Sequence, residues 1–292
     1  MKITFFFEHG QVNEIGTGHL YRTKVLSEEL KRRGHKISNV EDGVLISDND
    51  VLVIDHMFPQ TDLIQRAKAA GMKVVLIDGA AQDASSVDTS ISAFVNPAAT
   101  HKGIYYVVFP TNLSWDKYRP YKKSNSVFIG MGGYDANNYA KMAIEVLQDF
   151  GMNAIVAKSL NHPNFKEQYS NVVMFEEEDY YTAMRECIIG IVNGGLTLFQ
   201  ALYYGLPCVA IPQYEHQNNN IEYVSHCCLP AEPNKEDLKL KISWLMNSEY
   251  YREDLSRLAQ HYIDGKGIAR VCSLIEGLDE SRNKDTIRTN TN

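Results

Sequence analysis

Lys2-Ile-Thr-Phe-Phe-Phe7 and, after a loop, Gly16-Thr-Gly-His19-Leu-Tyr-Arg22 are the stretches of this 292-residue chain that decide the fold. Residues 2–7 form a short apolar run, rich in β-branched and aromatic residues, which is typical of a buried strand. Apolar residues then recur at helical spacing up to Gly34, which predicts a helix over 18–33. The order of strand, glycine-bounded loop and helix favours an open α/β sheet, with the loop at the edge where such sheets bind ligands.

The glycine-bounded loop carries a candidate acid/base residue. Gly16 and Gly18 let the backbone approach a ligand closely or adopt positive φ, and the N-terminal amides of the helix favour anions. His19 follows them, and a neutral imidazole has a pKa near the operating pH of most enzymes. The alternative is a tight turn in which His19 caps the helix or packs against it.

The composition indicates a globular protein that we expect to be soluble and cytoplasmic. Its apolar fraction is 44%, and its net charge of −7 argues against a general affinity for nucleic acid or anionic membranes. No apolar run is long enough to span a bilayer, and no signal peptide precedes the first strand, so stable membrane insertion is not expected. The five cysteines lack the CxxC spacing of zinc sites and are odd in number, which indicates neither a metal site nor a disulfide framework.

Short apolar runs alternate with helical patterns, and this alternation starts twice along the chain. Strands are predicted at 51–54, 73–77, 91–95, 105–109, 127–131, 154–157, 172–175, 188–192 and 207–211. Helices are predicted at 60–70, 137–150, 179–186, 196–204, 217–225 and within 235–278. The polar stretch 118–126 is the expected linker. We therefore predict an α/β protein of two Rossmann-like domains facing across a cleft, 1–122 and 123–279, followed by a polar tail, 280–292.

Polar residues end two strands of the first half. Asp55 and His56 follow one strand and Asp78 follows the next, so all three are expected at the same sheet edge as His19. A carboxylate there could orient an imidazole or bind a sugar hydroxyl. For Asp55, capping of the following turn is an equally good interpretation.

Two glycine loops follow strands of the second half. One contains Gly132 and Gly133, whose amides could bind a phosphate or a sugar, although a simple turn is the alternative. The other is Asn193-Gly194-Gly195-Leu196-Thr197, which leads into the predicted helix 196–204. Thr197 and the first amides of that helix could meet a diphosphate. Gln200 lies about one turn further along it.

An amide-rich run, 211–220, follows the last predicted strand. It includes Gln217 and Asn218, whose side chains both donate and accept hydrogen bonds, as sugar hydroxyls and base edges require. The alternative for Gln217 is an ordinary position near a helix N-terminus.

Taken together, these motifs resemble the PseG-type nucleotide-sugar hydrolases over nearly the whole chain. The matching residues are Gly16-Thr-Gly-His19 with Arg22, Ile54-Asp55-His56, Ile77-Asp78, Asn96-Pro97, Gly130 to Asp135, Gly194-Gly195 to Pro207, Gln217 and Asp264-Gly-Lys-Gly-Ile-Ala-Arg270. The resemblance implies a GT-B-like fold similar to the glycosyltransferase MurG, with no metal and no cofactor. It also implies hydrolysis of UDP-2,4-diacetamido-2,4,6-trideoxy-β-L-altropyranose to UDP and the free sugar, on the route to pseudaminic acid.

The resemblance also implies roles for single residues. His19 would activate water for inverting attack at the anomeric carbon, Thr197 would meet the diphosphate, and Gln217 would lie near the sugar or phosphate. The chain departs from the family pattern at Gln200, where a ribose-binding glutamate is usual. It also departs in 7–14, where an Arg-x-Asp-x-Ser run is usual.

Two other functions fit the same residues. In a GT-B glycosyltransferase with a UDP-sugar donor, His19 would deprotonate a sugar or lipid hydroxyl instead of water. An inactive nucleotide-sugar-binding homologue is the third hypothesis, motivated by Gln200 and by the altered residues before the loop. Each of the three takes a small nucleotide-sugar as its ligand, and no feature of the sequence indicates an oligomeric state.

Overall fold

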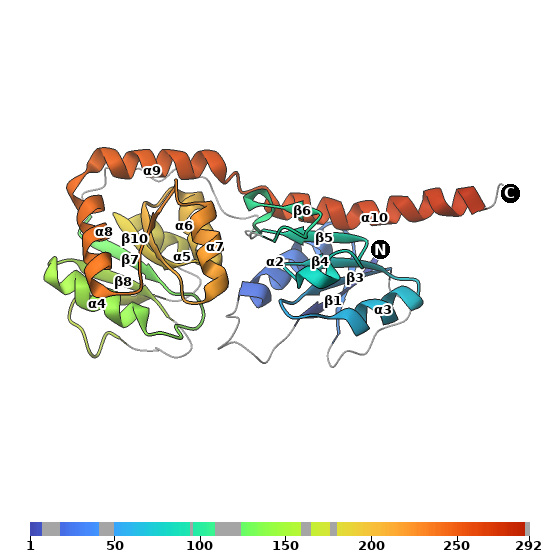
Figure 1. Cartoon of the computed structure of the whole chain (residues 1–292), viewed down its shortest axis with the longest axis horizontal. Helices are drawn as coiled ribbons and strands as arrows, with labels where there is room; N and C mark the ends of the chain where they lie inside the picture. Colours follow the sequence, from blue (N-terminus) through green and yellow to red (C-terminus); the bar gives the residue numbers. More distant parts are fainter. Residues whose placement is uncertain are drawn as a thin grey trace. The chain divides into compact units, whose positions relative to one another are not determined.

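The computed structural model describes residues 1–7, 18–40, 50–93, 96–108, 124–158, 165–175 and 180–289. The chain divides into two compact units, drawn in Figure 1. The first unit comprises Met1–Gln11, His19–Leu113 and Gly265–Asn292, and the second comprises Val12–Gly18 and Ser114–Asp264. Among the helices of the described residues, none is long and apolar enough to cross a membrane.

The first unit is built on a sheet of parallel strands in the order β2-β1-β3-β4-β5-β6. Its strands are β1 (Lys2–Phe7), β2 (Lys36–Asn39), β3 (Val51–Asp55), β4 (Lys73–Ile77), β5 (Thr89–Ser92) and β6 (His101–Lys102). The strands predicted at 2–7, 51–54 and 73–77 are thus confirmed. The strand predicted at 105–109 is wrong, because Ile104–Tyr106 form a 3₁₀ helix.

Helices cover both faces of this sheet (Figure 1). α2 (Gly18–Arg32) and α10 (Gly267–Thr289) share one hydrophobic cluster with Phe5. α3 (Thr61–Ala69) packs in a second cluster with Ile54. Successive side chains of a strand point to opposite faces, so a strand buried on both faces is apolar along its length, as β3 is from Val51 to Ile54, before Asp55 ends it.

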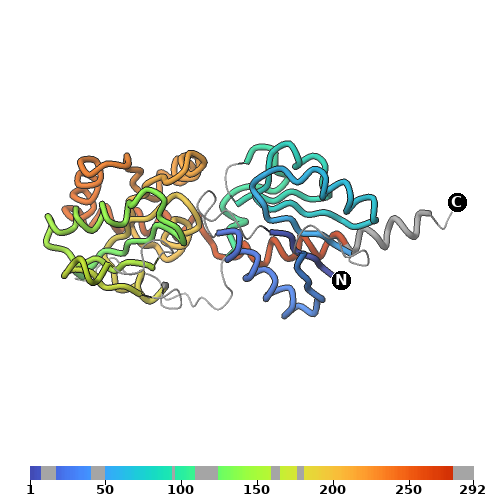
Figure 2. The backbone as a smooth tube through the Cα atoms, turned by 90° about the horizontal axis from the view of Figure 1, so that it is seen from below, coloured from blue at the N-terminus to red at the C-terminus, as the bar shows by residue number. Residues whose placement is uncertain are grey.

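The C-terminal helix belongs to the first unit, and Figure 2 shows the red tube of its first turns running along that unit. Ile268, Val271 and Ile275 are buried in the cluster that contains Phe5. The predicted second domain, 123–279, therefore extended too far, because the apolar stripe of α10 completes the core of the first unit. Residues 280–289, predicted as part of a polar tail, continue the helix.

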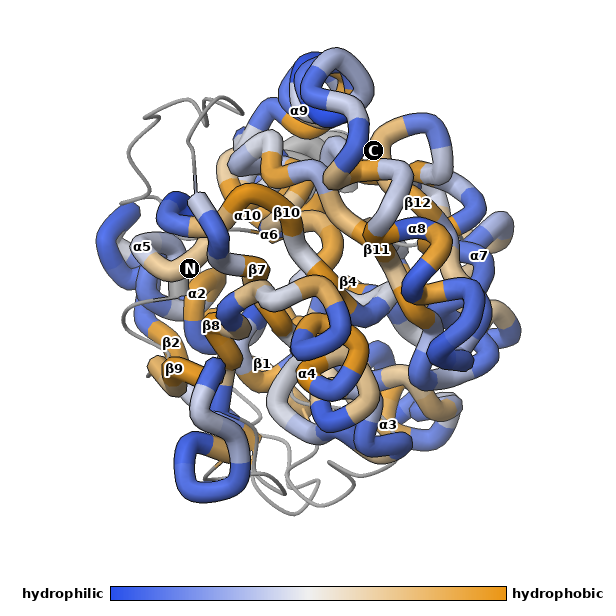
Figure 3. Tube along the Cα trace, turned by 90° about the vertical axis from the view of Figure 1, so that its left-hand side faces the viewer, coloured by the Kyte–Doolittle hydropathy of each residue, from blue (hydrophilic) through white to orange (hydrophobic). Residues whose placement is uncertain are grey.

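The second unit is built on another sheet of parallel strands, in the order β12-β11-β10-β7-β8-β9. Its strands are β7 (Ser126–Gly130), β8 (Asn153–Ala157), β9 (Val172–Phe175), β10 (Ile189–Asn193), β11 (Cys208–Ile211) and β12 (Leu229–Pro230). Its helices are α4 (Tyr139–Asp149), α5 (Tyr180–Glu186), α6 (Leu196–Tyr204), α7 (Glu215–Tyr223), α8 (Lys235–Asn247) and α9 (Glu249–Tyr262). α4 and α8 share one buried cluster with the sheet, whereas α6 contacts β10 and β11 outside that cluster. In Figure 3 much of the α7 tube is blue, the colour of hydrophilic residues.

Each sheet has one point at which the order of its strands reverses. The chain leaves β1 for β2 on one side and then returns to β3 on the other side of β1. In the second unit it leaves β7 for β8 and β9, and then returns to β10 on the other side of β7. Open parallel sheets bind their ligands at the carboxyl ends of the strands at such a switch point. The ends of β1 and β3 and the ends of β7 and β10 are therefore the candidate ligand-binding positions.

Candidate active site

His19 lies at the switch point of the first unit. It is half-buried in the first turn of α2, which begins at Gly18 and follows β1 in the chain. A Cβ atom at Gly18 would meet nothing within 4 Å, so this glycine is not required by packing. Gly16, the first glycine of the predicted loop, lies outside the described residues.

Arg22, one turn after His19, is bound by carboxylates at the carboxyl ends of β3 and β4. Its Nε donates to Asp55 Oδ2 at 2.8 Å and its Nη2 to Asp55 Oδ1 at 2.5 Å, which makes a bidentate pair. Its Nη1 donates to Asp78. The exposed fractions of Arg22 and Asp55 are only 7% and 1%. The register of β3 and β4 places Asp55 opposite Ile77, so Asp78 follows directly at the same edge.

The backbone and neighbouring hydroxyls hold these carboxylates in place. Asp78 has φ +45°, in the left-handed region that aspartate tolerates better than most residues. Its Oδ1 accepts hydrogen bonds from Ser92 Oγ at 2.7 Å and from the Ala93 amide at 3.0 Å. Burial by itself would lower the pKa of the Arg22 guanidinium, but the adjacent carboxylates outweigh it and raise this pKa above its ordinary value. The start of α2 is thereby tied to the ends of β3 and β4.

The predicted residues Arg22, Asp55 and Asp78 are thus brought together as one buried ion-pair network. Their predicted contact with a ligand stays a prediction. His56 has a different setting, because its Nδ1 accepts a hydrogen bond from the Phe58 amide at 3.1 Å and lies 3.1 Å from Gln60 Nε2. These contacts organise the turn that leads into α3, and the ligand role predicted for His56 likewise stays a prediction.

At the switch point of the second unit, Gln217 of α7 ties two strand ends together. Its Oε1 accepts hydrogen bonds from the Gly194 amide, after β10, at 3.1 Å and from the Gln213 amide, after β11, at 2.9 Å. It is 4% exposed. Gln217 thus binds the backbone of the Gly194 loop, and its predicted place near the sugar or phosphate stays a prediction.

Three further buried amide side chains complete this network. They were not among the site residues predicted from the sequence. Asn193 Nδ2 donates to the Met131 carbonyl at 3.2 Å, and Asn220 Nδ2 donates to the Gly194 carbonyl at 3.0 Å. Gln213 donates from Nε2 to the same Met131 carbonyl and accepts at Oε1 from the Ala136 amide. The signal for them was present in the amide-rich run and in the asparagine before the two glycines.

Glycines let these loops approach one another. A Cβ at Gly194 would lie 2.8 Å from Gln217 Cβ and 2.9 Å from Ile221 Cδ1, so a side chain there would displace α7. Gly132 has φ +77°, a conformation that favours glycine, and its position lies beside Asn193 Nδ2. The glycine loops after β7 and β10 therefore lie against each other, as the switch point requires.

The N-terminus of α6 faces this point without a side-chain cap. Its N-cap residue is Gly195, which makes no side-chain bond, and Leu196 and Thr197 form its first turn. Thr197 is 5% exposed, and its methyl group lies 2.8 Å from where a Cβ on Gly130 would be. Helix N-terminal amides next to a hydroxyl are suited to an anion such as a diphosphate.

The remaining predicted residues of the second unit have other settings. Gln200 is buried in α6, and its Nε2 donates to the Tyr181 hydroxyl at 3.3 Å. Asn218 is exposed on α7 and donates to the Glu215 carbonyl of its own helix. Gly133 is half-buried in the loop after β7. The described residues contain no group of three or more histidine, cysteine, aspartate or glutamate side chains placed to hold a metal ion.

Two curated proteins resemble this chain in sequence. The spore coat polysaccharide biosynthesis protein SpsG of Bacillus subtilis is 23% identical over 196 residues, which cover 60% of this chain and 57% of SpsG. The uncharacterized protein MJ1062 of Methanocaldococcus jannaschii is 22% identical over 266 residues, which cover 70% of this chain and 54% of MJ1062. The chain thus spans a little over half the length of these relatives. No protein-family model matches it.

Solved structures extend the similarity to almost the whole chain. Acinetobacter baumannii MurG superposes with a TM-score of 0.69 at 14% identity, covering 95% of this chain and 100% of MurG. The spinosyn rhamnosyltransferase SpnG, solved with thymidine diphosphate, gives 0.65 at 13% identity, covering 94% of this chain and 100% of SpnG. The predicted fold class is confirmed: the chain has the two-domain α/β fold of MurG and the GT-B glycosyltransferases, with a parallel six-stranded sheet in each unit.

Proposed function

We propose that this chain is a nucleotide-sugar-dependent glycosyltransferase that transfers a sugar from a nucleoside diphosphate to a hydroxyl group during polysaccharide synthesis. The observation that carries the proposal is the switch point of the second unit. There, the uncapped N-terminus of α6 and Thr197 adjoin two glycine loops fixed by buried amide side chains. The name of the relative SpsG supports the link to polysaccharide, and the thymidine diphosphate in the SpnG structure supports a nucleotide ligand on this fold.

The second unit would bind the donor. The diphosphate would accept hydrogen bonds from the first amides of α6 and from the Thr197 hydroxyl. The glycine backbones at Gly132 and Gly195 would allow close approach, because no side chain projects from them. Binding in this way places the negative charge of the leaving diphosphate at the positive end of the α6 dipole, which stabilises it as the bond breaks.

The first unit would supply the base. His19, as a neutral imidazole, would accept the proton of the acceptor hydroxyl while that oxygen attacks the anomeric carbon. The oxygen attacks from the side opposite the diphosphate, so the configuration inverts, and the bond from the anomeric carbon to the diphosphate oxygen breaks with its electron pair on the diphosphate. Arg22, bound to Asp55 and Asp78, would hold the first turn of α2, and His19 with it, in a fixed position.

Hydrolysis of the nucleotide-sugar is the second candidate function. The order of motifs from Gly16-Thr-Gly-His19 to Asp264–Arg270, which resembles the PseG-type hydrolases, favours it. The chemistry at the anomeric carbon is the same, with water in place of the acceptor hydroxyl. The two functions differ in whether the diphosphate is released without an acceptor.

Incubation of the purified protein with UDP-sugars and dTDP-sugars, including 2,4-diacetamido-trideoxy sugars, separates these functions. The reactions run with and without saccharide acceptors, in EDTA, and release of nucleoside diphosphate is measured. Release that requires an acceptor, with a glycosylated product, supports the transferase. Release without acceptor contradicts it in favour of the hydrolase. Nucleotide binding without release under either condition contradicts both and indicates an inactive nucleotide-sugar-binding protein.

A further inference from the structure

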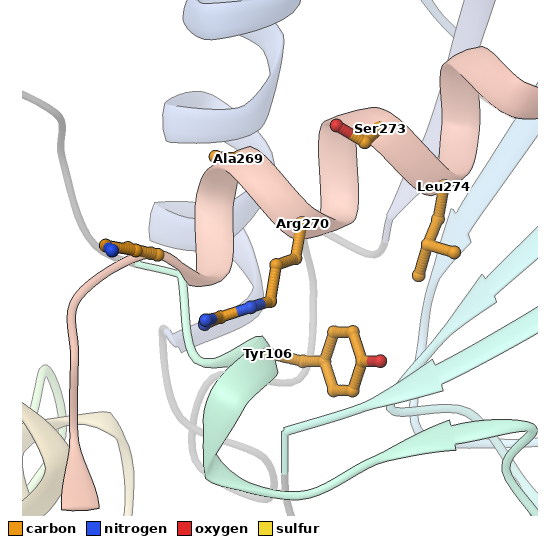
Figure 4. A pocket seen from close by; sticks show the side chains of 6 residues that line it. Tyr106, Ala269, Arg270, Ser273 and Leu274 are labelled. Carbon is orange, nitrogen blue, oxygen red and sulfur yellow. The ribbon is translucent and has the colours of Figure 1, made fainter.

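The first unit contains a pocket of about 430 Å³ where the start of α10 meets the 3₁₀ helix Ile104–Tyr106 (Figure 4). Its volume lies in the range of about 300–1,000 Å³ that is usual for small-molecule sites. The residues that line it are Tyr106, Lys266, Ala269, Arg270, Ser273 and Leu274. None of these residues belongs to the candidate active site described above.

The walls of this pocket are held rigidly together. A Cβ at Gly267 would lie 1.9 Å from the Val107 carbonyl oxygen, so α10 begins in direct backbone contact with the end of the 3₁₀ helix. Arg270 Nη1 donates to the Tyr105 carbonyl at 3.1 Å, and its guanidinium lies 5.5 Å from the centre of the Tyr105 ring. In Figure 4 the Arg270 side chain extends toward the segment that carries Tyr106. The cation is therefore positioned before any ligand arrives.

The lining combines positive charge with apolar surface. Lys266 directly precedes α10 and Arg270 lies in its first turn, and both line the pocket. Two of the six described lining residues are cations, in a chain whose net charge is −7. Tyr106 and Leu274 add an aromatic ring and an aliphatic side chain. This combination suits a ligand that carries an anionic group beside the apolar face of a ring.

The pocket lies at the ligand-binding edge of its sheet. The 3₁₀ helix follows β6, so it stands at the carboxyl ends of the parallel strands. α10 starts at that edge, and Glu276, further along it, bonds to Arg33 and His35 after the end of α2. α2 and α10 thus run in the same direction from this edge, where Asp55 also lies.

We propose that this pocket binds the anionic group, a phosphate or a carboxylate, of a saccharide acceptor, with Lys266 and Arg270 as its contacts. The assignment to the acceptor rests on the proposed glycosyltransferase function, whereas the binding of anionic saccharides does not. Anionic membranes are bound by clusters of about 4–8 basic residues. The two cations of this pocket therefore fit a single anionic group better than a lipid surface.

Isothermal titration of the whole protein with glucose 1-phosphate and with glucuronate tests the proposal, with methyl glucoside as the neutral comparison. Both anions should bind and methyl glucoside should not. Lys266→Gln and Arg270→Gln should each raise the Kd for the anions about tenfold, the effect of losing one charged hydrogen bond. Arg270→Lys, which keeps the charge, should restore part of the affinity. Lys68→Gln removes an exposed lysine of α3, outside the pocket, and should change nothing.

The Kd for UDP and dTDP, measured on the same variants, separates this proposal from the proposed function. It should not change, because the donor site lies in the second unit. Equal anion affinities in the wild type and in both Gln variants would contradict the proposed role of this pocket. Binding of methyl glucoside as tight as that of the two anions would also contradict it. Binding to phosphatidylglycerol vesicles without binding to either sugar anion would overturn it in favour of a membrane contact. Anion binding that depends on Lys266, together with no turnover of any nucleotide-sugar, would support the anion-binding pocket and contradict the proposed glycosyltransferase function.

Discussion

Arg22 shows how one residue links the candidate base to the sheet. It lies one turn after His19 and is bound to Asp55 of β3 and to Asp78 directly after β4. A buried ion pair adds little net stability, since desolvation offsets the attraction, but removal of one partner leaves the others as uncompensated buried charges. The role of Arg22 is therefore best tested by removing its charge and measuring stability and turnover separately.

Arg22→Met should lower the free energy of unfolding by about 3–5 kcal/mol, because it leaves the buried carboxylate of Asp55 and the half-buried carboxylate of Asp78 without their cation. Urea unfolding followed by circular dichroism measures this. Arg66→Met is the matched control, since Arg66 of α3 pairs with Asp62 on the exposed surface at 3.4 Å. Loss of that pair should cost less than about 1 kcal/mol. Equal losses in the two variants would contradict a buried role for Arg22.

His19→Ala should lower kcat by about 10²–10⁴, which is the usual contribution of a general base. The Kd for the nucleoside diphosphate should stay the same, because the proposed donor site lies in the second unit. Single-turnover assays and calorimetry measure the two quantities. His226→Ala, an exposed histidine of the second unit, is the control and should keep full activity. A His19→Ala protein with normal kcat would exclude His19 as the base.

The sequence could place candidate residues at strand ends, but it could not assign their partners. Gly194 and Thr197 were predicted after one strand and Gln217 after the next, and chain order alone brings the ends of parallel strands to one edge. The pairing of Asp55 and Asp78 with Arg22 depends on the register of β3 and β4, which hydrophobic patterns do not specify. Buried amides such as Asn220 were missed because an amide in a polar run looks the same whether it is solvated or buried.

The helix α7 packs closely against the loop before α6, and this close approach requires a glycine at position 194. Gly194→Ala should destabilise the second unit by about 1–3 kcal/mol, as overpacking usually does, because its Cβ would lie within 3 Å of Gln217 and Ile221. It should also weaken nucleotide binding, since Gln217 bonds the loop before α6. Urea unfolding and calorimetry with UDP and dTDP measure both effects.

Gly277→Ala is the matched control for Gly194→Ala. A Cβ there meets nothing within 4 Å, and Gly277 lies inside α10. Alanine is better than glycine in a helix by roughly 1 kcal/mol, so this variant should be as stable as the wild type or slightly more stable. If both variants lost stability equally, close packing at Gly194 would not be the cause.

Elements with strong apolar patterns were predicted well, and weakly patterned ones were not. The helix predicted at 196–204 and the strand predicted at 172–175 have those bounds as α6 and β9. β2 was missed because Lys36–Asn39 is a polar edge strand, which has a partner on one side only. The apolar run at 105–109 was mistaken for a strand, since short runs do not distinguish strands from helical turns.

For the whole molecule, the least predictable feature is the return of the chain to the first unit. The pattern of α10 indicates that one face is buried, but not which sheet it is buried against. Ile268, Val271, Cys272 and Ile275 complete the cluster that contains Phe5. Because α10 follows the second unit in the chain, a boundary drawn from sequence assigned it there. The first unit is therefore discontinuous, and its stability depends on the C-terminal helix.

A chain that ends at Ile263 should consequently lose the fold of the first unit while the second unit stays folded. Removal of a single buried Ile side chain costs about 2–5 kcal/mol, and the free energy of unfolding of a domain is only about 5–15 kcal/mol. The shorter chain lacks Ile268, Val271, Cys272 and Ile275 from this core, and that loss exceeds what the first unit can tolerate. Hydrogen exchange should show loss of protection in β1 and β3 but not in β7 and β10. A chain that ends at Leu278, which keeps these core residues, should retain protection in both sheets. Full protection of β1 in the shorter chain would mean that α2 and the sheet form a stable core without α10.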